Sequence, residues 1–77
     1  MPEDDVLTRL AEIWAAVLLT EVGPETDFFE EGGQSVAALQ MITRVEEEYG
    51  LELSIRDIFE SPTLGEFTEA VRARAGR

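Results

Sequence analysis

One segment of the sequence leads from an aromatic pair, through two glycines, into a helix: Asp27-Phe28-Phe29-Glu30-Glu31-Gly32-Gly33-Gln34-Ser35-Val36-Ala37-Ala38-Leu39. Gly32 and Gly33 carry no side chains that would block another molecule from approaching the Ser35 hydroxyl. Two adjacent aromatic residues cannot both point inward in regular structure. We therefore expect one of Phe28 and Phe29 in the core and the other beneath the loop. The segment predicts an accessible serine hydroxyl at a helix N-terminus.

Two long helices are predicted on either side of this loop. The second runs from about residue 35 to residue 49 and stops at Gly50, a residue typical of helix C-termini. For the first, Asp4 or Asp5 is the expected N-cap, and the helix should end near residues 19–20. Its tryptophan is interpreted as a core anchor. Apolar residues recur in it at steps of three and four, which gives one buried stripe: Val6, Leu7, Leu10, Ile13, Trp14, Val17 and Leu18.

Two short helices are predicted to follow, each opened by a capping box. Pro62 separates them, because proline disfavours helical geometry at the residue before it. No order is expected beyond Arg72. The prediction is one all-α domain over residues 1–77, ordered over about 5–72. It is a small four-helix bundle with a long first loop, tied down by Val22 and the aromatic pair, and a short third helix. The capping boxes are Ser54-Ile55-Arg56-Asp57 and Thr63-Leu64-Gly65-Glu66.

The composition excludes several classes of partner. The chain has a formal net charge of −11, and its six basic residues are all arginine. Such a surface repels the phosphates of nucleic acids and of anionic lipids. With no cysteine and no histidine, the chain lacks the usual zinc ligands. No apolar run has membrane-spanning length, so we expect a cytoplasmic protein that binds neither nucleic acid nor membrane. We also expect it to be a monomer.

No catalytic constellation is found. The segment from Gly33 to Ala37 partly matches the G-x-S-x-G nucleophile motif. That motif needs a histidine base, and the chain has no histidine. Lysine is also absent, which excludes a Ser-Lys arrangement. Glu46, Glu47 and Glu48 point about 100° apart on a helix and cannot converge on one cation. The glycine pair lacks the Lys-Ser/Thr of a phosphate-binding loop. The chain is therefore predicted not to be an enzyme.

What remains is Ser35 at a helix N-terminus, where backbone N–H groups and the helix dipole favour a bound or attached phosphate. Serine is also a good N-cap, so a purely structural role stays open. The second helix has more apolar residues than one buried stripe needs. Val36, Ala37, Ala38 and Met41 are therefore candidates for an exposed patch beside Ser35, with scattered surface alanine as the alternative.

From about Val6 to Arg72, the order and spacing of these segments resemble those of phosphopantetheine-dependent carrier proteins. The likeness is greatest to the peptidyl carrier proteins (thiolation domains) of nonribosomal peptide synthesis. The first matching stretch resembles the prosthetic-group attachment motif, and the last resembles the join between the third and fourth carrier helices. The stretches are Phe28-Phe29-Glu30-Glu31-Gly32-Gly33-Gln34-Ser35-Val36, the helix from Leu10 to Leu18, Glu47-Glu48-Tyr49-Gly50-Leu51-Glu52-Leu53, and Ile58-Phe59-Glu60-Ser61-Pro62-Thr63-Leu64-Gly65-Glu66-Phe67.

The resemblance implies that a phosphopantetheinyl transferase, which brings its own magnesium, attaches 4′-phosphopantetheine from coenzyme A to Ser35. The terminal thiol of this arm would carry an aminoacyl or peptidyl group as a thioester, which suits a chain without cysteine. Further implied partners are an adenylation enzyme and condensation or tailoring enzymes of antibiotic-type peptide biosynthesis. The expected partner contacts are Phe28, Gly33, Gln34, Val36 and Met41.

The branch of the family is inferred from the residues around Ser35. Gln34 stands where fatty-acid-type carriers usually have aspartate and peptidyl carriers have histidine or aspartate, so it settles neither case. The near-neutral start of the second helix favours a peptidyl carrier over an acyl carrier of polyketide or fatty-acid synthesis. An acidic helical adaptor without a prosthetic group is the competing class. Met1 followed directly by Pro2 favours a freestanding protein over an excised domain.

Overall fold

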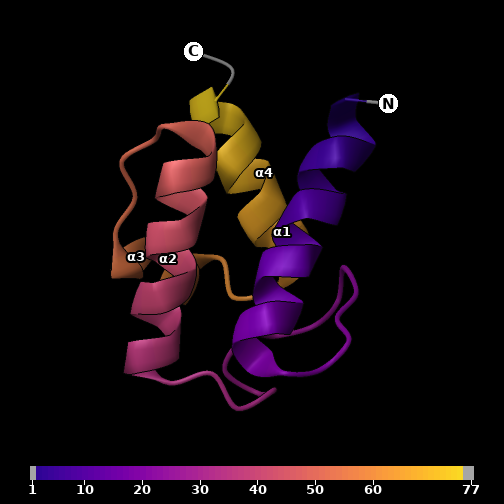
Figure 1. Ribbon diagram of the computed structural model, residues 1–77, viewed down its shortest axis with the longest axis vertical. Coiled ribbons are helices and arrows are strands. Elements are labelled where there is room, and N and C mark those ends of the chain that lie inside the picture. Colours follow the sequence, from indigo (N-terminus) through magenta and orange to yellow (C-terminus); the bar gives the residue numbers. More distant parts are fainter. Residues whose placement is uncertain (1, 76–77) are drawn as a thin grey trace.

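The computed structural model describes residues 2–75. Within them the chain forms four helices, so the predicted all-α four-helix architecture is confirmed. In Figure 1, α1 and α2 lie side by side and run in opposite directions, α4 packs against α1, and α3 joins α2 to α4. The start of α2 lies at the lower end of the molecule, away from the ends of α1 and α4 that carry the chain termini. The helices are α1 (Pro2–Leu18), α2 (Ser35–Tyr49), α3 (Ile55–Glu60) and α4 (Leu64–Ala75).

An aromatic cluster lies at the centre of the core. Trp14 is fully buried, as predicted, and its ring meets the edge of the Phe28 ring at a centroid distance of 5.1 Å and an angle of 75°. Phe67 from α4 lies 5.9 Å from the same indole. Edge-to-face pairs of this kind add to the free energy gained from burial alone. The core thus connects α1, α4 and the long loop, because Phe28 belongs to that loop.

The two neighbouring phenylalanines point in different directions, as the sequence predicted. Phe28 is buried, whereas Phe29 is half-buried and stacks flat on Phe59 of α3 with ring centroids 5.0 Å apart. Phe59 keeps 57% of its surface exposed. The aromatic pair therefore anchors the loop both to the core and to α3.

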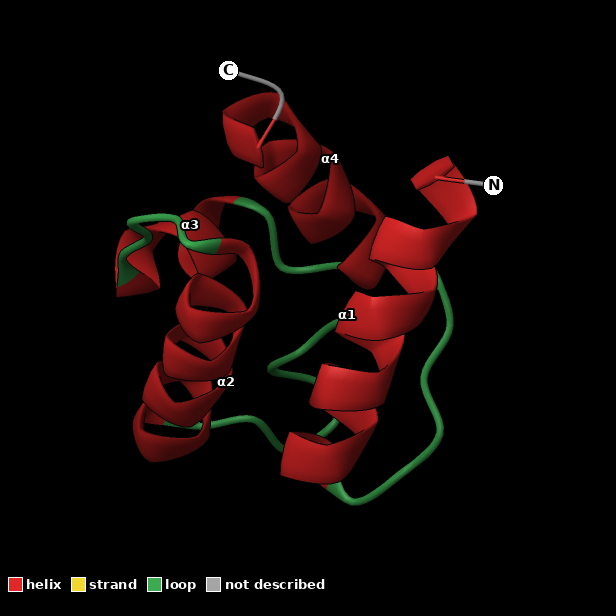
Figure 2. Ribbon diagram, turned by 45° about the horizontal axis from the view of Figure 1, so that its top comes forward, coloured by secondary structure: helices red, strands yellow, loops and turns green. Residues whose placement is uncertain are grey.

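Backbone hydrogen bonds fix the long loop, residues 19–34, to the join between α3 and α4. The N–H of Phe28 donates to the carbonyl of Pro62 at 2.8 Å. In return, the N–H of Leu64 donates to Thr26 at 3.0 Å and that of Gly65 to Pro24 at 2.8 Å. Figure 2 shows this loop turning back along α1 before it reaches the start of α2. These bonds satisfy backbone groups that a buried loop would otherwise leave unpaired.

The predicted helix boundaries are right in the middle of the chain and wrong at its two ends. α2 ends where expected, with Gly50 at φ 66° donating its N–H to the carbonyl of Glu46. α1 begins at Pro2, so the N-cap predicted at Asp4 or Asp5 is wrong. Proline suits the first turn, since its missing N–H would have no acceptor there. α1 ends at Leu18, one residue earlier than predicted.

Both capping boxes are present. At α3, the Ser54 N–H donates to the Asp57 carboxylate at 2.8 Å, and at α4 the Thr63 N–H donates to Glu66 at 3.3 Å. α4 continues to Ala75, so the prediction of no order beyond Arg72 is wrong.

Arg74 explains the extra turn of α4. It pairs with Asp57 at 2.7 and 3.1 Å and donates to the Glu52 carbonyl at 2.9 Å. Positive charge in a last turn also suits the helix dipole. No helix within residues 2–75 is long and apolar enough to cross a membrane.

Candidate functional site

Ser35 is the first residue of α2, and its side chain is exposed. The cap position is occupied instead by Gln34, which is extended (φ −126°, ψ 179°) and makes no side-chain capping hydrogen bond. The structural alternative, in which Ser35 is the N-cap, is therefore wrong. Its hydroxyl is not needed to complete the helix, and it is accessible to another molecule.

Gly33, two residues before Ser35, is buried because it packs on Phe28. A Cβ at position 33 would lie 2.3 Å from two carbons of the Phe28 ring and 2.6 Å from the Phe28 carbonyl oxygen. The Gly33 N–H donates to that same carbonyl at 3.0 Å. Gly32 has φ +98°, a backbone conformation that favours glycine. The glycines thus do more than leave room for an enzyme, because they fasten the start of α2 to a core residue.

An Asx turn completes the approach to the helix. One carboxylate oxygen of Asp27 accepts the N–H groups of Phe29 and Glu30, at 2.9 and 3.1 Å. This local bond holds the loop at the point where Phe28 enters the core. The position of Ser35 is thereby set by a continuous chain of contacts from the tryptophan cluster to the helix start.

The environment of Ser35 suits an attached phosphate. The first helical hydrogen bond runs from the Ala38 N–H to the Gln34 carbonyl at 2.7 Å, so the N–H groups of residues 35–37 have no acceptor within the helix. No acidic residue lies in the first turn of α2. Donors and dipole therefore favour negative charge at this end, and no neighbouring carboxylate in that turn opposes it. The residues present fit a phosphodiester on the Ser35 oxygen.

The predicted partner contacts divide into exposed and buried residues. Gln34 and Val36 are exposed, Val36 to 69%, whereas Phe28 and Met41 have no exposed surface and Gly33 is buried. The prediction that Met41 is exposed is wrong, and Ala38 is likewise buried. Both lie on the stripe of α2 that faces the core, with Ile42 and Val45.

Sequence reasoning missed Leu39, which is 53% exposed. With four neighbours it lines a shallow groove, which we call the outward face of α2. A count of apolar positions showed that some of them must face out, but it did not show which ones. The outward face consists of Val36, Leu39, Gln40, Thr43 and Arg44.

The three consecutive glutamates of α2 serve different neighbours. The Glu46 carboxylate accepts a hydrogen bond from the N–H of Leu53 at 2.9 Å. The Glu48 carboxylate pairs with the guanidinium of Arg9 in α1, with N–O distances of 3.0 and 3.1 Å. Glu47 is exposed. Among residues 2–75, no group of three or more potential ligands is placed to hold a metal ion.

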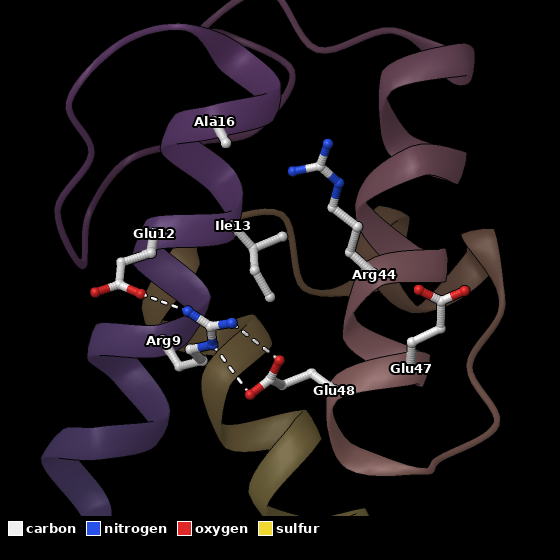
Figure 3. A pocket seen from close by; sticks show the side chains of 7 residues that line it. All are labelled: Arg9, Glu12, Ile13, Ala16, Arg44, Glu47 and Glu48. Atoms are coloured by element: carbon white, nitrogen blue, oxygen red, sulfur yellow. Dashed lines mark hydrogen bonds and ion pairs between the residues drawn. The ribbon is translucent and has the colours of Figure 1, made fainter.

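Arg9 connects α1 to α2 in the groove drawn in Figure 3, where it lies between Glu12 and Glu48. The hydrogen bond from Arg9, together with its charge, holds the pKa of Glu48 below the ordinary value of a glutamate. The same contacts raise the pKa of Arg9. The cluster is a structural clamp between two helices, since each charge already has a partner within the protein.

Comparison with known proteins agrees with this geometry. Residues 8–71 match the family described as "Phosphopantetheine attachment site". Surfactin synthase subunit 1 of Bacillus subtilis (strain 168) is 44% identical over 64 residues, which are 82% of this chain and 2% of that protein. The chain therefore spans only a small part of the synthases it matches.

Solved structures show the same fold. BlmI, a type-II acyl-carrier protein from Streptomyces verticillus involved in bleomycin biosynthesis, has a TM-score of 0.89 and 38% identity, covering 94% of this chain and 88% of that one. A peptidyl carrier protein solved in complex with the phosphopantetheine transferase Sfp and coenzyme A has a TM-score of 0.85 and 34% identity. The match covers 90% of this chain and 91% of that one.

The chain therefore belongs to the phosphopantetheine attachment-site family, the carrier domains whose prosthetic group is 4′-phosphopantetheine. Within that family it is of the peptidyl carrier type found in nonribosomal peptide synthetases. The predictions of family, cofactor and carrier branch are confirmed. An adaptor without a prosthetic group and a fatty-acid or polyketide carrier are the less supported alternatives.

Proposed function

We propose that Ser35 is the attachment point of the 4′-phosphopantetheine arm and that the chain carries an aminoacyl or peptidyl group on it as a thioester. The observation that supports this is the placement of Ser35. Its side chain is exposed at the first position of α2, with the capping position taken by Gln34. The Phe28–Gly33 contact holds that position from below.

In the loading reaction, the Ser35 oxygen attacks the β-phosphorus of coenzyme A. The pyrophosphate P–O bond breaks, adenosine 3′,5′-bisphosphate leaves, and the hydroxyl proton passes to a base of the transferase. The chain has no histidine and no lysine to serve as that base. The role proposed for the protein in this step is that of the substrate, with the catalytic groups supplied by the transferase.

Once attached, the arm supplies the thiol that the chain lacks, since it has no cysteine. The start of α2 would hold the phosphodiester of the arm. The N–H groups of residues 35–37 would donate to its oxygens, and the positive end of the α2 dipole would stabilise its charge. Thioester cargo is thus held at the end of a long tether, which raises its effective concentration at each enzyme in turn.

The proposed partners follow from this role. A transferase must load Ser35, an adenylation enzyme must charge the thiol, and condensation or tailoring enzymes must use the thioester. The carrier structure solved with a transferase and coenzyme A supports the first of these. We further propose that contacts with partners involve Gln34, Val36 and the neighbouring exposed residues of α2. Phe28, Gly33 and Met41 would act only from beneath that surface, because they are buried.

The test is intact-protein mass spectrometry after incubation with coenzyme A, magnesium and the transferase Sfp. The wild-type chain should gain one phosphopantetheine, and Ser35→Ala should gain none. Ser61→Ala is the matched control, because it removes a different serine hydroxyl and leaves Ser35 in place. Arm attachment to Ser35→Ala would show that the site is elsewhere. No mass change on folded wild-type chain, with a second transferase also inactive, would refute the carrier function.

A further inference from the structure

The short helix α3 buries little of its own surface. It spans six residues, too few for a helix that is stable by itself in water. Among residues 55–60, all of which the structure describes, Ile58 alone is buried. In Figures 1 and 2, α3 lies on the side of α2 away from α1. Contacts at its two ends must therefore contribute much of what keeps α3 docked.

One side chain of α4 holds the N-terminal end of α3. The Arg74 guanidinium donates to both carboxylate oxygens of Asp57, at 2.7 and 3.1 Å, and to the carbonyl of Glu52 at 2.9 Å. The same carboxylate accepts the N–H of Ser54 in the capping box at 2.8 Å. The last turn of α4, the start of α3 and the segment before it are thus joined through one forked, charge-assisted contact.

Aromatic contacts hold the other end of α3 and connect it to the loop that leads to Ser35. Phe59 stacks on Phe29 with ring centroids 5.0 Å apart, and Phe29 meets Phe28 edge-on at 5.6 Å. Phe28 in turn packs against Gly33, two residues before Ser35. A displacement of α3 would therefore remove the surface on which Phe29 rests.

We propose that Arg74 acts as a latch on α3. While Arg74 is paired with Asp57, α3 stays docked and the loop before Ser35 keeps its geometry. When the pair opens, α3 and this loop loosen together, as one local unit, and the rest of the bundle stays folded. The latch does not require an attached arm, so the inference is independent of the proposed function of Ser35.

Two features of the pair suit a contact that opens and closes. The Arg74 side chain is 45% exposed, and partly exposed ion pairs are weak enough to open without unfolding of the protein. Beside the pair lies an open hollow, bordered also by the small side chains of Ala70 and Ala73. The guanidinium can therefore turn away from Asp57 without displacing a packed neighbour.

The experiment is hydrogen–deuterium exchange of the full chain, read by mass spectrometry of its peptides. Arg74→Gln should speed exchange about fivefold over residues 55–60, the upper range for an exposed ion pair, and by a similar factor over residues 28–33. Arg74→Lys keeps the charge without the fork and should lie between Arg74→Gln and the wild type. Arg56→Gln is the matched control, because it removes the same charge from an exposed arginine of α3 itself. It should stay within twofold of the wild type.

Urea and salt separate a local latch from a general loss of stability. Urea below the unfolding transition should speed exchange strongly over residues 10–18 of α1 and weakly over residues 28–33 and 55–60, because local opening exposes little surface. The ratio between Arg74→Gln and the wild type should shrink as salt screens the pair. In a Phe59→Ala background, Arg74→Gln should still loosen residues 55–60 but have no further effect on residues 28–33.

Three results would overturn the inference. Equal exchange over residues 55–60 in Arg74→Gln and Arg56→Gln would mean that the ion pair does not hold α3. The same rate and urea dependence over residues 55–60 as over residues 10–18 would mean that α3 undocks only when the whole chain unfolds. No effect of Arg74→Gln on residues 28–33 would mean that the loop does not follow α3.

Discussion

Gly33→Ala should destabilise the whole bundle, although it changes a loop residue by one methyl group. The added Cβ would lie 2.3 Å from carbons of the Phe28 ring and 2.6 Å from its carbonyl oxygen. That ring cannot move aside freely, because Trp14 lies 5.1 Å away on one side and Phe29 5.6 Å away on another. Overpacking of this kind costs about 1–3 kcal/mol. A domain of this size has roughly 4–12 kcal/mol in all.

The assay is urea unfolding at equilibrium, followed by the fluorescence of Trp14, which is the chain's single tryptophan. Phe28→Leu opens space at the same contact and should lose stability by itself. In the double variant, however, the total loss in the free energy of unfolding should be smaller than the sum of the two single losses, because the smaller side chain accommodates the new methyl. A Gly33→Ala chain as stable as the wild type, or strict additivity in the double variant, would refute the packing argument.

Four further outcomes are expected. Ser35→Ala should leave the urea midpoint nearly unchanged, within about 0.5 kcal/mol, because Ser35 does not cap α2; a loss above 1 kcal/mol would contradict this. Met41→Glu should unfold the chain, since the residue has no exposed surface, and native circular dichroism would disprove its burial. Asp57→Ala should cost at least about 1 kcal/mol in thermal unfolding, because it removes both the carboxylate of the α3 capping box and the partner of Arg74; an unchanged midpoint would argue against both contacts. The pKa of Glu48 is lowered by Arg9, so this pair stabilises the fold at neutral pH and loses that effect as acid protonates Glu48. Arg9→Gln should therefore show a smaller loss of stability between neutral and acidic pH, and an equal loss would mean that the pair contributes nothing.

Local signals in the sequence were sufficient to predict where the helices in the middle of the chain begin and end. Gly50 and the two capping boxes act through bonds between residues a few positions apart, so a single sequence contains all the information needed. Arg74 is different. Its partners Asp57 and Glu52 lie far away in the chain, and no local sequence pattern predicts that they contact the last turn of α4.

The same distinction explains the site. The aromatic pair, the glycines and the serine predicted where Ser35 stands, because each acts on its immediate neighbours. Which side of α2 faces solvent depends on how α1 and α3 approach it. Met41 and Leu39 are both apolar residues of one helix, yet the first is buried and the second is 53% exposed. Only the packing of the other helices decides between them.

The bonds between the long loop and the join of α3 and α4 have a consequence for the order of events during synthesis. The loop that positions Ser35 is held by Pro62, Leu64 and Gly65, which leave the ribosome well after it. Domains generally complete their folding only when the required segments have emerged. A nascent chain that ends before residue 62 has the serine but not the geometry around it. We therefore expect the attachment site to be among the last features to form, so that arm attachment follows completion of the fold.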